Sequence, residues 1–215
     1  MEAGHGTGNV GGRGDDRSVD DSPVSVTTRL WPLLVAVHDA LRAGVAVSAA
    51  VHAAHGWNPT ADRHLDHQLV RREAMERLRP WGAALDDGSS DPLLEQQLTL
   101  TDDSGDDLGL AMSGLILRTP RDVLRIWHSD DGELPSPDSH GLRAFYRQQP
   151  AAQTQLALDD EPGRTRPDRC SLALLWADSR GALTRLELVR PYGHVGRRVQ
   201  VDWRTDLLRR LAGRL

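Results

Sequence analysis

The stretch SLALLWADSRGALTRLELVR, residues 171–190, predicts a β-hairpin and sets the character of the C-terminal half of the chain. Two runs rich in Leu, Val and Ala flank a polar tetrapeptide, residues 178–181, that ends in Gly181. Asp, Ser and Gly favour tight turns, and glycine reaches the positive φ angles that short hairpin turns require. We therefore expect antiparallel strands over residues 171–177 and 182–190.

Further strand patterns lie on both sides of this hairpin. Alternating or continuous apolar runs predict strands over residues 97–101, 108–117 and 123–128. Near the C-terminus Val199, Val201 and Trp203 alternate with polar residues, which predicts a strand that buries these three side chains. Thr205 is placed to cap a short last helix. The pattern predicts a six- or seven-stranded, mainly antiparallel sheet with a short C-terminal helix.

The N-terminal part of the chain has helical periodicity instead. Leucine and valine recur at helical spacing over residues 30–41, and Gly44 predicts the end of that helix. A short second helix is expected over residues 48–56. A third is expected from Asn58, a capping residue, up to Pro80, which disfavours its continuation. These signals predict a three-helix unit.

The expected organisation is therefore an α+β fold in which the three-helix unit packs on or next to the sheet. Residues 1–27 are rich in Gly, Asp and Ser, lack apolar periodicity and are expected to form a disordered tail. Residues 28–80 would form the helical unit. Residues 81–215 would form the β domain with its C-terminal helix.

Composition excludes several classes of function. The chain has 215 residues, 39% hydrophobic and 27% charged, which suits a globular protein. All 26 of its basic residues are arginine, so Schiff-base lysines and Walker loops are excluded. The single cysteine, Cys170, excludes an internal disulfide and a cysteine zinc cage. The longest apolar run, residues 30–37, is short for a membrane span, and no signal-like stretch is evident, so we expect a cytoplasmic protein with no membrane contact.

Charge is distributed unevenly along the chain. Residues 81–161 carry 5 Arg against 16 acidic residues, whereas residues 162–215 carry 12 Arg against 5. The predicted C-terminal strands contain Arg185, Arg190, Arg197, Arg198 and Arg204. These arginines can pair with the acidic middle of the same chain, contact phosphates or bind an anionic ligand. Pairing within the chain is the first interpretation.

The order of helices over residues 41–72 resembles the helix-turn-helix segment of DNA-binding regulators. In that family a short helix rich in small residues supports a following helix that enters the major groove. On a helical wheel Ala61, Leu65 and Leu69 form one apolar side, which we expect to face inward. The resemblance implies that DNA is contacted by the residues on the other side and at the start of the helix: Asn58, Thr60, Arg63, His64, His67 and Arg71.

Histidines and the lone cysteine are the remaining candidates for chemistry. His52 and His55, and likewise His64 and His67, are three residues apart, a spacing at which two side chains share a helix face. A metal site built from them is possible in principle, but the usual two-histidine zinc motif has a spacing of four and an adjacent glutamate. We therefore expect surface or capping histidines, with no metal and no cofactor. Cys170 is expected to be a small, half-buried hydrophobic residue.

These observations favour a non-enzymatic DNA-binding or transcription-regulatory protein, with the sheet as a module for binding a partner or ligand. One alternative is an accessory subunit without DNA contact, whose acidic middle or sheet edge binds a protein partner. A metal-dependent enzyme that uses the helical histidines is the third hypothesis.

Overall fold

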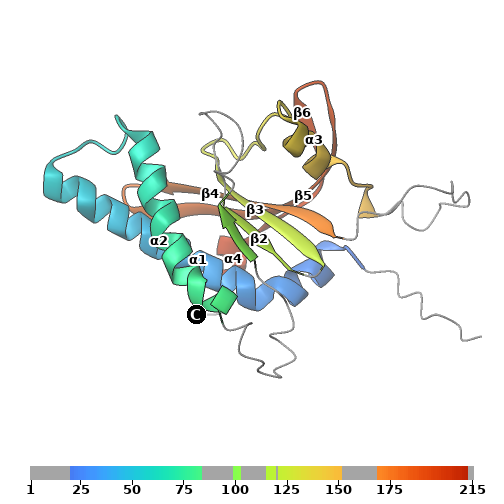
Figure 1. Ribbon diagram of the computed structural model, residues 1–215, viewed down its shortest axis with the longest axis horizontal. Helices are drawn as coiled ribbons and strands as arrows, with labels where there is room; N and C mark the ends of the chain where they lie inside the picture. Colours follow the sequence, from blue (N-terminus) through green and yellow to red (C-terminus); the bar gives the residue numbers. More distant parts are fainter. Residues whose placement is uncertain (1–19, 84–98, 103–114, 120, 152–168, 213–215) are drawn as a thin grey trace, which may run out of the picture.

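The computed structural model describes residues 20–83, 99–102, 115–119, 121–151 and 169–212. The helices are α1 (Pro23–His55), α2 (Arg63–Ala83), α3 (His140–Tyr146) and α4 (Leu207–Ala212). The strands are β1 (Thr99–Asp102), β2 (Leu115–Arg118), β3 (Asp122–His128), β4 (Cys170–Ser179), β5 (Ala182–Val195) and β6 (Arg198–Asp206). A long helical hairpin lies along the sheet (Figure 1), which confirms the α+β class. Residues 1–19 of the predicted tail, and the predicted strand residues 97–98 and 108–114, lie outside the described residues.

Helix α1 is one continuous helix of 33 residues, so the predicted stop at Gly44 and the separate helix over residues 48–56 were wrong. The helix begins at Pro23, inside the predicted tail, because Ser22 caps it by accepting a hydrogen bond from the Ser25 N–H at 3.3 Å. Gly44 is buried where α2 crosses α1, and a Cβ there would lie 2.6 Å from the Val70 carbonyl oxygen. This glycine serves close helix packing rather than helix termination.

Helix α2 begins five residues later than predicted. Asp62, rather than Asn58, caps it by accepting a hydrogen bond from the Leu65 N–H at 3.0 Å. Asn58 instead accepts hydrogen bonds from the Thr60 N–H and hydroxyl, which closes a turn between the helices. Pro80 does not end the helix, which continues to Ala83. The N-terminal region is therefore a two-helix hairpin, and the predicted three-helix unit does not form.

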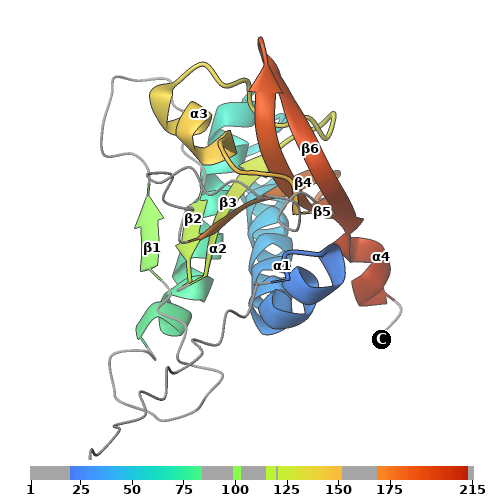
Figure 2. The same cartoon turned by 90° about the vertical axis from the view of Figure 1, so that its right-hand side faces the viewer.

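Within the described part of the chain the sheet has six strands, which are neighbours in sequence order from β1 to β6. Four of the pairings are antiparallel, but β3 and β4 are parallel, with Asp122 opposite Cys170 and His128 opposite Trp176. Parallel neighbours need a crossover connection, and this one contains α3, a helix that the sequence did not predict. Ser139 caps α3 by accepting a hydrogen bond from the Leu142 N–H at 3.1 Å. Figure 2 shows α3 beside the far ends of β5 and β6.

The β4–β5 hairpin confirms the prediction made from residues 171–190. Ser179 pairs with Ala182, and the two turn residues between them, Arg180 and Gly181, have φ angles of 52° and 77°. Positive φ at both positions is the requirement of a tight two-residue hairpin turn. The predicted strand at the C-terminus also forms, but Trp203 does not share a face with Val199 and Val201.

A bulge in β6 explains the changed orientation of Trp203. Arg190 pairs with Trp203 whereas Pro191 pairs with Val201, so β6 has one extra residue, Asp202, at this point. Val199 and Val201 pack in the cluster on one face of the sheet, and Trp203 packs against the cluster on the other face. A one-residue insertion reverses the phase of a period-two pattern, which the sequence alternation could not reveal.

Each face of the sheet contributes to its own hydrophobic cluster. The larger cluster joins the sheet to the helical hairpin, with Leu30, Leu34, Val70 and Leu78 among its helical members. The smaller cluster lies on the opposite face and joins the sheet to α3, where it contains the following residues: Trp127, Phe145, Tyr146, Ala173, Leu175 and Val189. The hydroxyl of the buried Tyr146 donates to the Pro135 carbonyl at 2.8 Å, and burial raises the pKa of this phenol. The helical hairpin therefore covers one face of the sheet, and α3 packs on the other face.

Candidate functional site

The six residues predicted to contact DNA divide into two groups in the structure. Asn58, Thr60, Arg63 and His64 are exposed around the connection between α1 and α2. His67 and Arg71 are half-buried, and Arg71 donates to the Gln68 side chain at 2.7 Å. The structure therefore brings four of the six together at the exposed end of the hairpin.

The predicted inward face of α2 was wrong over most of the helix. Val70, Ala74 and Leu78 are almost completely buried, whereas Leu65 and Leu69 are only half-buried. The apolar residues near the start of the predicted helix suggested the wrong rotation, because the main contact with α1 is made further along, where α2 crosses Gly44. His67 consequently points toward the sheet, on the buried side.

His67 lies in a cluster of ionisable side chains at the junction of α2 with the ends of β3 and β4. Its ring lies 3.8 Å from the ring of His128, centroid to centroid. His128 Nε2 is 3.5 Å from a carboxylate oxygen of Asp178 and 3.6 Å from one of Asp130. Burial and the neighbouring His128 lower the pKa of His67. Among the described residues no group of three or more His, Cys, Asp or Glu side chains is arranged to hold a metal ion.

Arg63 belongs to the same cluster, because its guanidinium donates to Asp130. Both partners are largely exposed, Arg63 at 61% and Asp130 at 46%, so this ion pair contributes little to stability. It does orient Arg63 toward an acidic loop. The cluster therefore joins the start of α2 to the end of the sheet.

Ser48, His52 and Asp66 are a second polar group, between α1 and α2, and their composition suggests a nucleophile triad. The connectivity differs from that of a triad. The Ser48 hydroxyl donates to Asp66, and His52 Nδ1 lies 2.8 Å from the Ser48 carbonyl oxygen. A triad requires the imidazole to accept the serine proton. Ser48 is also fully buried, so these residues stabilise the helix pair.

No protein-family model matches this chain, and neither a curated protein nor a solved structure does. The function must therefore be inferred from the surfaces that the chain exposes and from the groups that it buries.

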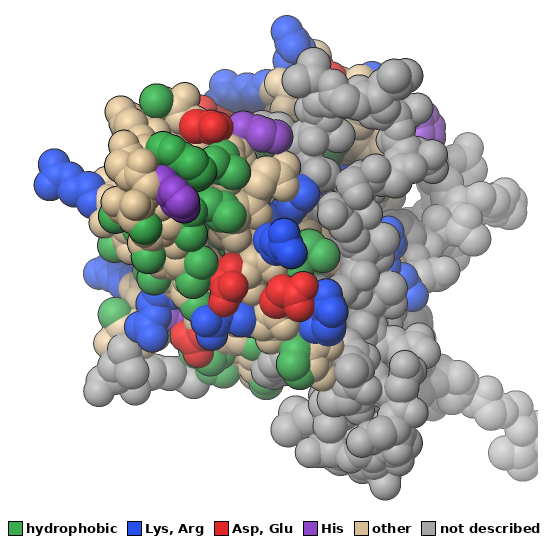
Figure 3. Space-filling view, turned by 60° about the vertical axis from the view of Figure 1, so that its left-hand side comes forward, with side chains coloured by type: hydrophobic (Ala, Val, Ile, Leu, Met, Phe, Trp, Pro, Cys, Tyr) green, Lys and Arg blue, Asp and Glu red, His purple; other side chains and the backbone are tan. Residues whose placement is uncertain are grey.

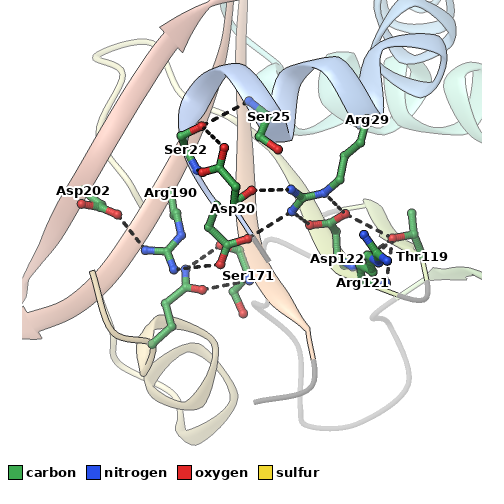
Figure 4. A network of polar contacts seen from close by, with 12 residues as sticks. Asp20, Ser22, Ser25, Arg29, Thr119, Arg121, Asp122, Ser171, Arg190 and Asp202 are labelled. Atoms are coloured by element: carbon green, nitrogen blue, oxygen red, sulfur yellow. Dashed lines mark hydrogen bonds and ion pairs between the residues drawn. The ribbon is translucent and has the colours of Figure 1, made fainter. Parts of the chain in front are cut away.

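A chain of alternating charges is buried where the start of α1 meets the sheet (Figure 4). Arg29 makes two hydrogen bonds to Asp122, at 2.6 and 3.1 Å, and contacts Asp21 at 3.3 Å. Arg190 contacts the same Asp21 at 3.5 Å and Asp202 at 2.7 Å. Every charge in this network has an opposite charge beside it, so its arrangement is that of a structural clamp rather than of an open binding site.

Cys170 lies beside this network and is buried. Burial and the nearby Asp21 carboxylate raise the pKa of its thiol to about 12. A thiol with this pKa stays protonated at neutral pH and is a poor nucleophile. The interpretation of Cys170 as a small hydrophobic residue agrees with this environment.

The arginines of the C-terminal strands pair largely within the chain. Arg185 donates to the backbone oxygens of Ser129 and Asp130, and Arg204 donates to the Gly132 oxygen. Arg197 contacts the Asp138 carboxylate at 3.2 Å, and Arg190 takes part in the buried clamp. The segment from residue 129 to residue 138 is thereby fastened onto β5 and β6. Arg198 is the exception, since its guanidinium makes no hydrogen bond or ion pair with any residue that the structure describes.

The end of the helical hairpin exposes an apolar surface. We call Ala43, Val47, Ala50, Ala54 and Trp57 the outer row. Trp57 is 49% exposed and Val47 36% exposed, and α1 carries no Asp, Glu or Arg between residues 43 and 55. Figure 3 shows hydrophobic side chains gathered on the face that carries this end of the hairpin. An isolated exposed apolar residue is ordinary, whereas a row of apolar side chains on one helix face is a candidate interaction surface.

Helix α1 also has the length and apolar composition to cross a membrane, over a window of which 39% is buried inside the structure. The buried part is the side that packs on α2 and the sheet. The absence of membrane contact stays a prediction, and it is tested below together with the proposed use of the outer row.

Proposed function

We propose that this protein is a non-enzymatic interaction protein that assembles as a dimer through the outer row of its helical hairpin. The observation that supports the proposal is the half-exposed Trp57 at the end of an uncharged, outward-facing stretch of α1. Tryptophan is the residue most enriched among those that dominate the energy of protein interfaces. The proposal shares with the alternative hypothesis an interaction protein without DNA contact, but it places the interface on the helical hairpin instead of the acidic middle or the sheet edge.

The spacing of the outer row suits a helix as its occupant. Its helical members, from Ala43 to Ala54, follow one another at intervals of four and three residues, the repeat with which one helix presents a straight seam to another, and Trp57 lies just beyond the helix end at His55. Four of the five side chains are alanine or valine, and small side chains allow two helix axes to approach to about 8 Å. From Ala43 to Ala54 the helical part of the row extends about 17 Å at 1.5 Å per residue. This length is sufficient for a helix–helix interface of about three turns, with Trp57 at its end.

Trp57 is held in place before any partner binds. Its ring stacks on His55 with centroids 4.5 Å apart and meets the edge of His52 at 6.2 Å. Its backbone N–H donates to the His52 carbonyl at 2.9 Å, where the helix ends at Gly56. A side chain that is already ordered loses less conformational entropy on binding. Trp57 is therefore suited to be the anchor of the interface.

Charges at the two ends of the outer row favour a second copy of this chain as the occupant. The exposed Arg42 adjoins one end, and the exposed Asp62 lies beyond Trp57 at the other. If two α1 helices pair antiparallel about a two-fold axis at Ala50, Arg42 of each copy approaches the end that carries Asp62 in the other. Each Trp57 then covers the small Ala43 of its partner. A two-fold interface must be self-complementary in this way.

We expect the full-length chain to be a dimer at micromolar concentration in sedimentation velocity. Ala50→Glu should produce a monomer with an unchanged circular dichroism spectrum, because it places two like charges at the symmetry axis. Trp57→Ala should weaken the dimer at least tenfold, as truncating an anchor residue costs about 2 kcal/mol or more. The matched control is Ala144→Glu on the exposed face of α3, which should leave the dimer intact.

Cross-linking gives a second measurement of the same interface. Because Cys170 is buried, a cysteine at position 50 would be the accessible thiol among the described residues. Ala50→Cys should form a disulfide-linked dimer under mild oxidation, and Ala144→Cys should not. A monomeric wild type at 100 micromolar that also fails to cross-link would overturn the proposal. Flotation with phosphatidylcholine vesicles that Ala50→Glu abolishes would also overturn it, in favour of a membrane surface.

DNA contact through the hairpin end is a second proposal, favoured by the joint exposure of Asn58, Thr60, Arg63 and His64. It ranks second because Asp62 and Asp130 lie beside these residues. Fluorescence anisotropy with a 30-base-pair duplex should show salt-sensitive binding that Arg63→Ala weakens and Asp130→Asn, which releases Arg63, strengthens. Absence of binding at 50 mM salt, or no effect of either variant, would exclude it.

A further inference from the structure

A cavity of about 470 Å³ lies between the segment that follows β3 and the turned end of β5 and β6. Its volume is within the range of pockets that hold small organic molecules, roughly 300–1,000 Å³. Three side chains give it an apolar surface: Leu134, Val199 and Val201, which also pack against the cluster beneath α3. Three arginines line it as well: Arg197, Arg198 and Arg204. The cavity thus combines an apolar surface with several guanidinium groups.

Two ion pairs and a backbone contact hold the walls of this cavity. Arg197 contacts Asp138 at 3.2 Å, and Arg204 donates to the Gly132 oxygen and contacts Glu187 at 3.2 Å. Arg197 therefore joins the turn before β6 to the segment that follows β3, and Arg204 joins β6 to that segment and to β5. The two segments lie far apart in sequence but side by side in space (Figures 1 and 2). The cavity is consequently formed by two segments, the irregular segment after β3 and the turned end of β5 and β6.

Arg198 differs from its neighbours because its guanidinium has no protein partner among the described residues. The Arg197–Asp138 pair is exposed, with Arg197 at 81%, so a bound anion can replace Asp138 at little cost. Of the residues that the structure describes, Glu133 is the single carboxylate that lines the cavity, and it forms no ion pair with Arg198. The free hydrogen-bond donors at this site are therefore mainly cationic.

From these observations we infer that the cavity binds a small organic anion, with a carboxylate or phosphate group on Arg198 and an apolar part on Leu134, Val199 and Val201. Guanidinium groups recognise carboxylates and phosphates through paired N–H donors. An apolar body adds affinity because Val199 and Val201 would lose contact with water. The inference is independent of the proposed dimer, since β5 runs from a turn against Ala49 of α1 to the cavity at its other end.

The test is an NMR titration of the ¹⁵N-labelled full-length protein with phenyl phosphate, which carries both an anionic and an apolar group. We expect saturable shifts at the amides of residues 133–136 and 197–201. Arg198→Gln should weaken binding about tenfold, whereas Glu133→Gln should strengthen it two- to threefold by removing the opposing charge. Inorganic phosphate and phenol, each with one of the two groups, should bind at least fivefold more weakly.

Specific outcomes would overturn the inference. They include no saturable shift up to 10 mM phenyl phosphate, an unchanged affinity in Arg198→Gln, and weaker binding in Glu133→Gln, which would indicate a cationic or zwitterionic ligand. Equal affinity for inorganic phosphate would overturn the apolar part of the site. Trp57→Ala serves as the control for the other surface and should leave the titration unchanged.

Discussion

Gly44→Ala is expected to lower the free energy of unfolding by about 2 kcal/mol, although alanine is the better helix former by about 1 kcal/mol. The added Cβ would lie 2.6 Å from the Val70 carbonyl oxygen and 3.1 Å from the Val70 Cα. These are backbone atoms, which cannot rotate away as a flexible side chain can. The helices would therefore have to separate along the whole contact that buries Val70 and Ala74. Urea denaturation followed by circular dichroism measures the effect.

The matched control for this variant is Gly141→Ala in α3. Gly141 is also helical, but nothing lies within 4 Å of the position that its Cβ would occupy. Here the helix propensity of alanine is unopposed, so stability should rise by up to about 1 kcal/mol. The same chemical change is thus expected to have opposite signs at two helical glycines. A Gly44→Ala protein as stable as the wild type would show that α1 and α2 do not approach this closely.

Gly44 also shows the limit of reading glycine from sequence. A glycine after an apolar helical run predicts a helix end, and Gly56 follows this rule with a φ of 64°. At Gly44 the cause of the glycine is a carbonyl oxygen 26 residues away, which no local pattern contains. The error split α1 in two, and the resemblance to a helix-turn-helix segment depended on that split. Tertiary contact, not local preference, decided this element.

The sheet was predictable where its signals are local. The turn at Arg180 and Gly181 fixes β4 against β5 through backbone angles that few residues adopt, so the hairpin could be read directly. The parallel pairing of β3 with β4 could not be predicted from the sequence, because about 40 residues separate these two strands along the chain. The bulge at Asp202, whose carboxylate contacts Arg190, could not be predicted either, because no local pattern marks the extra residue.

For the contacts of the surface arginines, the distribution of charge along the chain was more informative than the hydrophobic periodicity. The excess of arginine after residue 162 and of acid before it predicted pairing with the acidic middle of the chain, and among the described residues the structure shows such a carboxylate partner for Arg197, with Asp138. Arg185 and Arg204 donate to backbone oxygens of residues 129–132, and Arg190 pairs with Asp21 and Asp202, which lie outside the acidic middle. Several of the partners are backbone oxygens, which a count of charges does not include. Only the structure distinguishes Arg198 from the other arginines, because it shows that the Arg198 guanidinium lines the cavity without a partner among the described residues. The outer row could not be predicted from the sequence, because both the buried and the exposed face of α1 are apolar in this region. The hydrophobic periodicity therefore does not distinguish the two faces.

Arg29→Ala is expected to lower the free energy of unfolding by about 3 to 5 kcal/mol, a larger loss than that at Gly44. The Asp122 side chain is only 2% exposed, and without Arg29 its remaining side-chain contact among the described residues is the Thr119 hydroxyl at 3.4 Å. An uncompensated carboxylate would then be buried between α1 and β3. Arg63→Ala is the control, because the exposed pair of Arg63 with Asp130 should contribute no more than about 1 kcal/mol.

A double-mutant cycle separates the charge effect from simple loss of packing. Replacing both partners, Arg29→Met with Asp122→Leu, removes the buried charges together and should restore most of the stability lost in Arg29→Ala. If Arg29 served only to fill space, Arg29→Met alone would already be as stable as the wild type. We expect Arg29→Met to remain destabilised by at least about 2 kcal/mol, because the methionine fills the space and leaves Asp122 unpaired. Additive losses in the double variant would contradict the assignment of this network as an electrostatic clamp between α1 and the sheet.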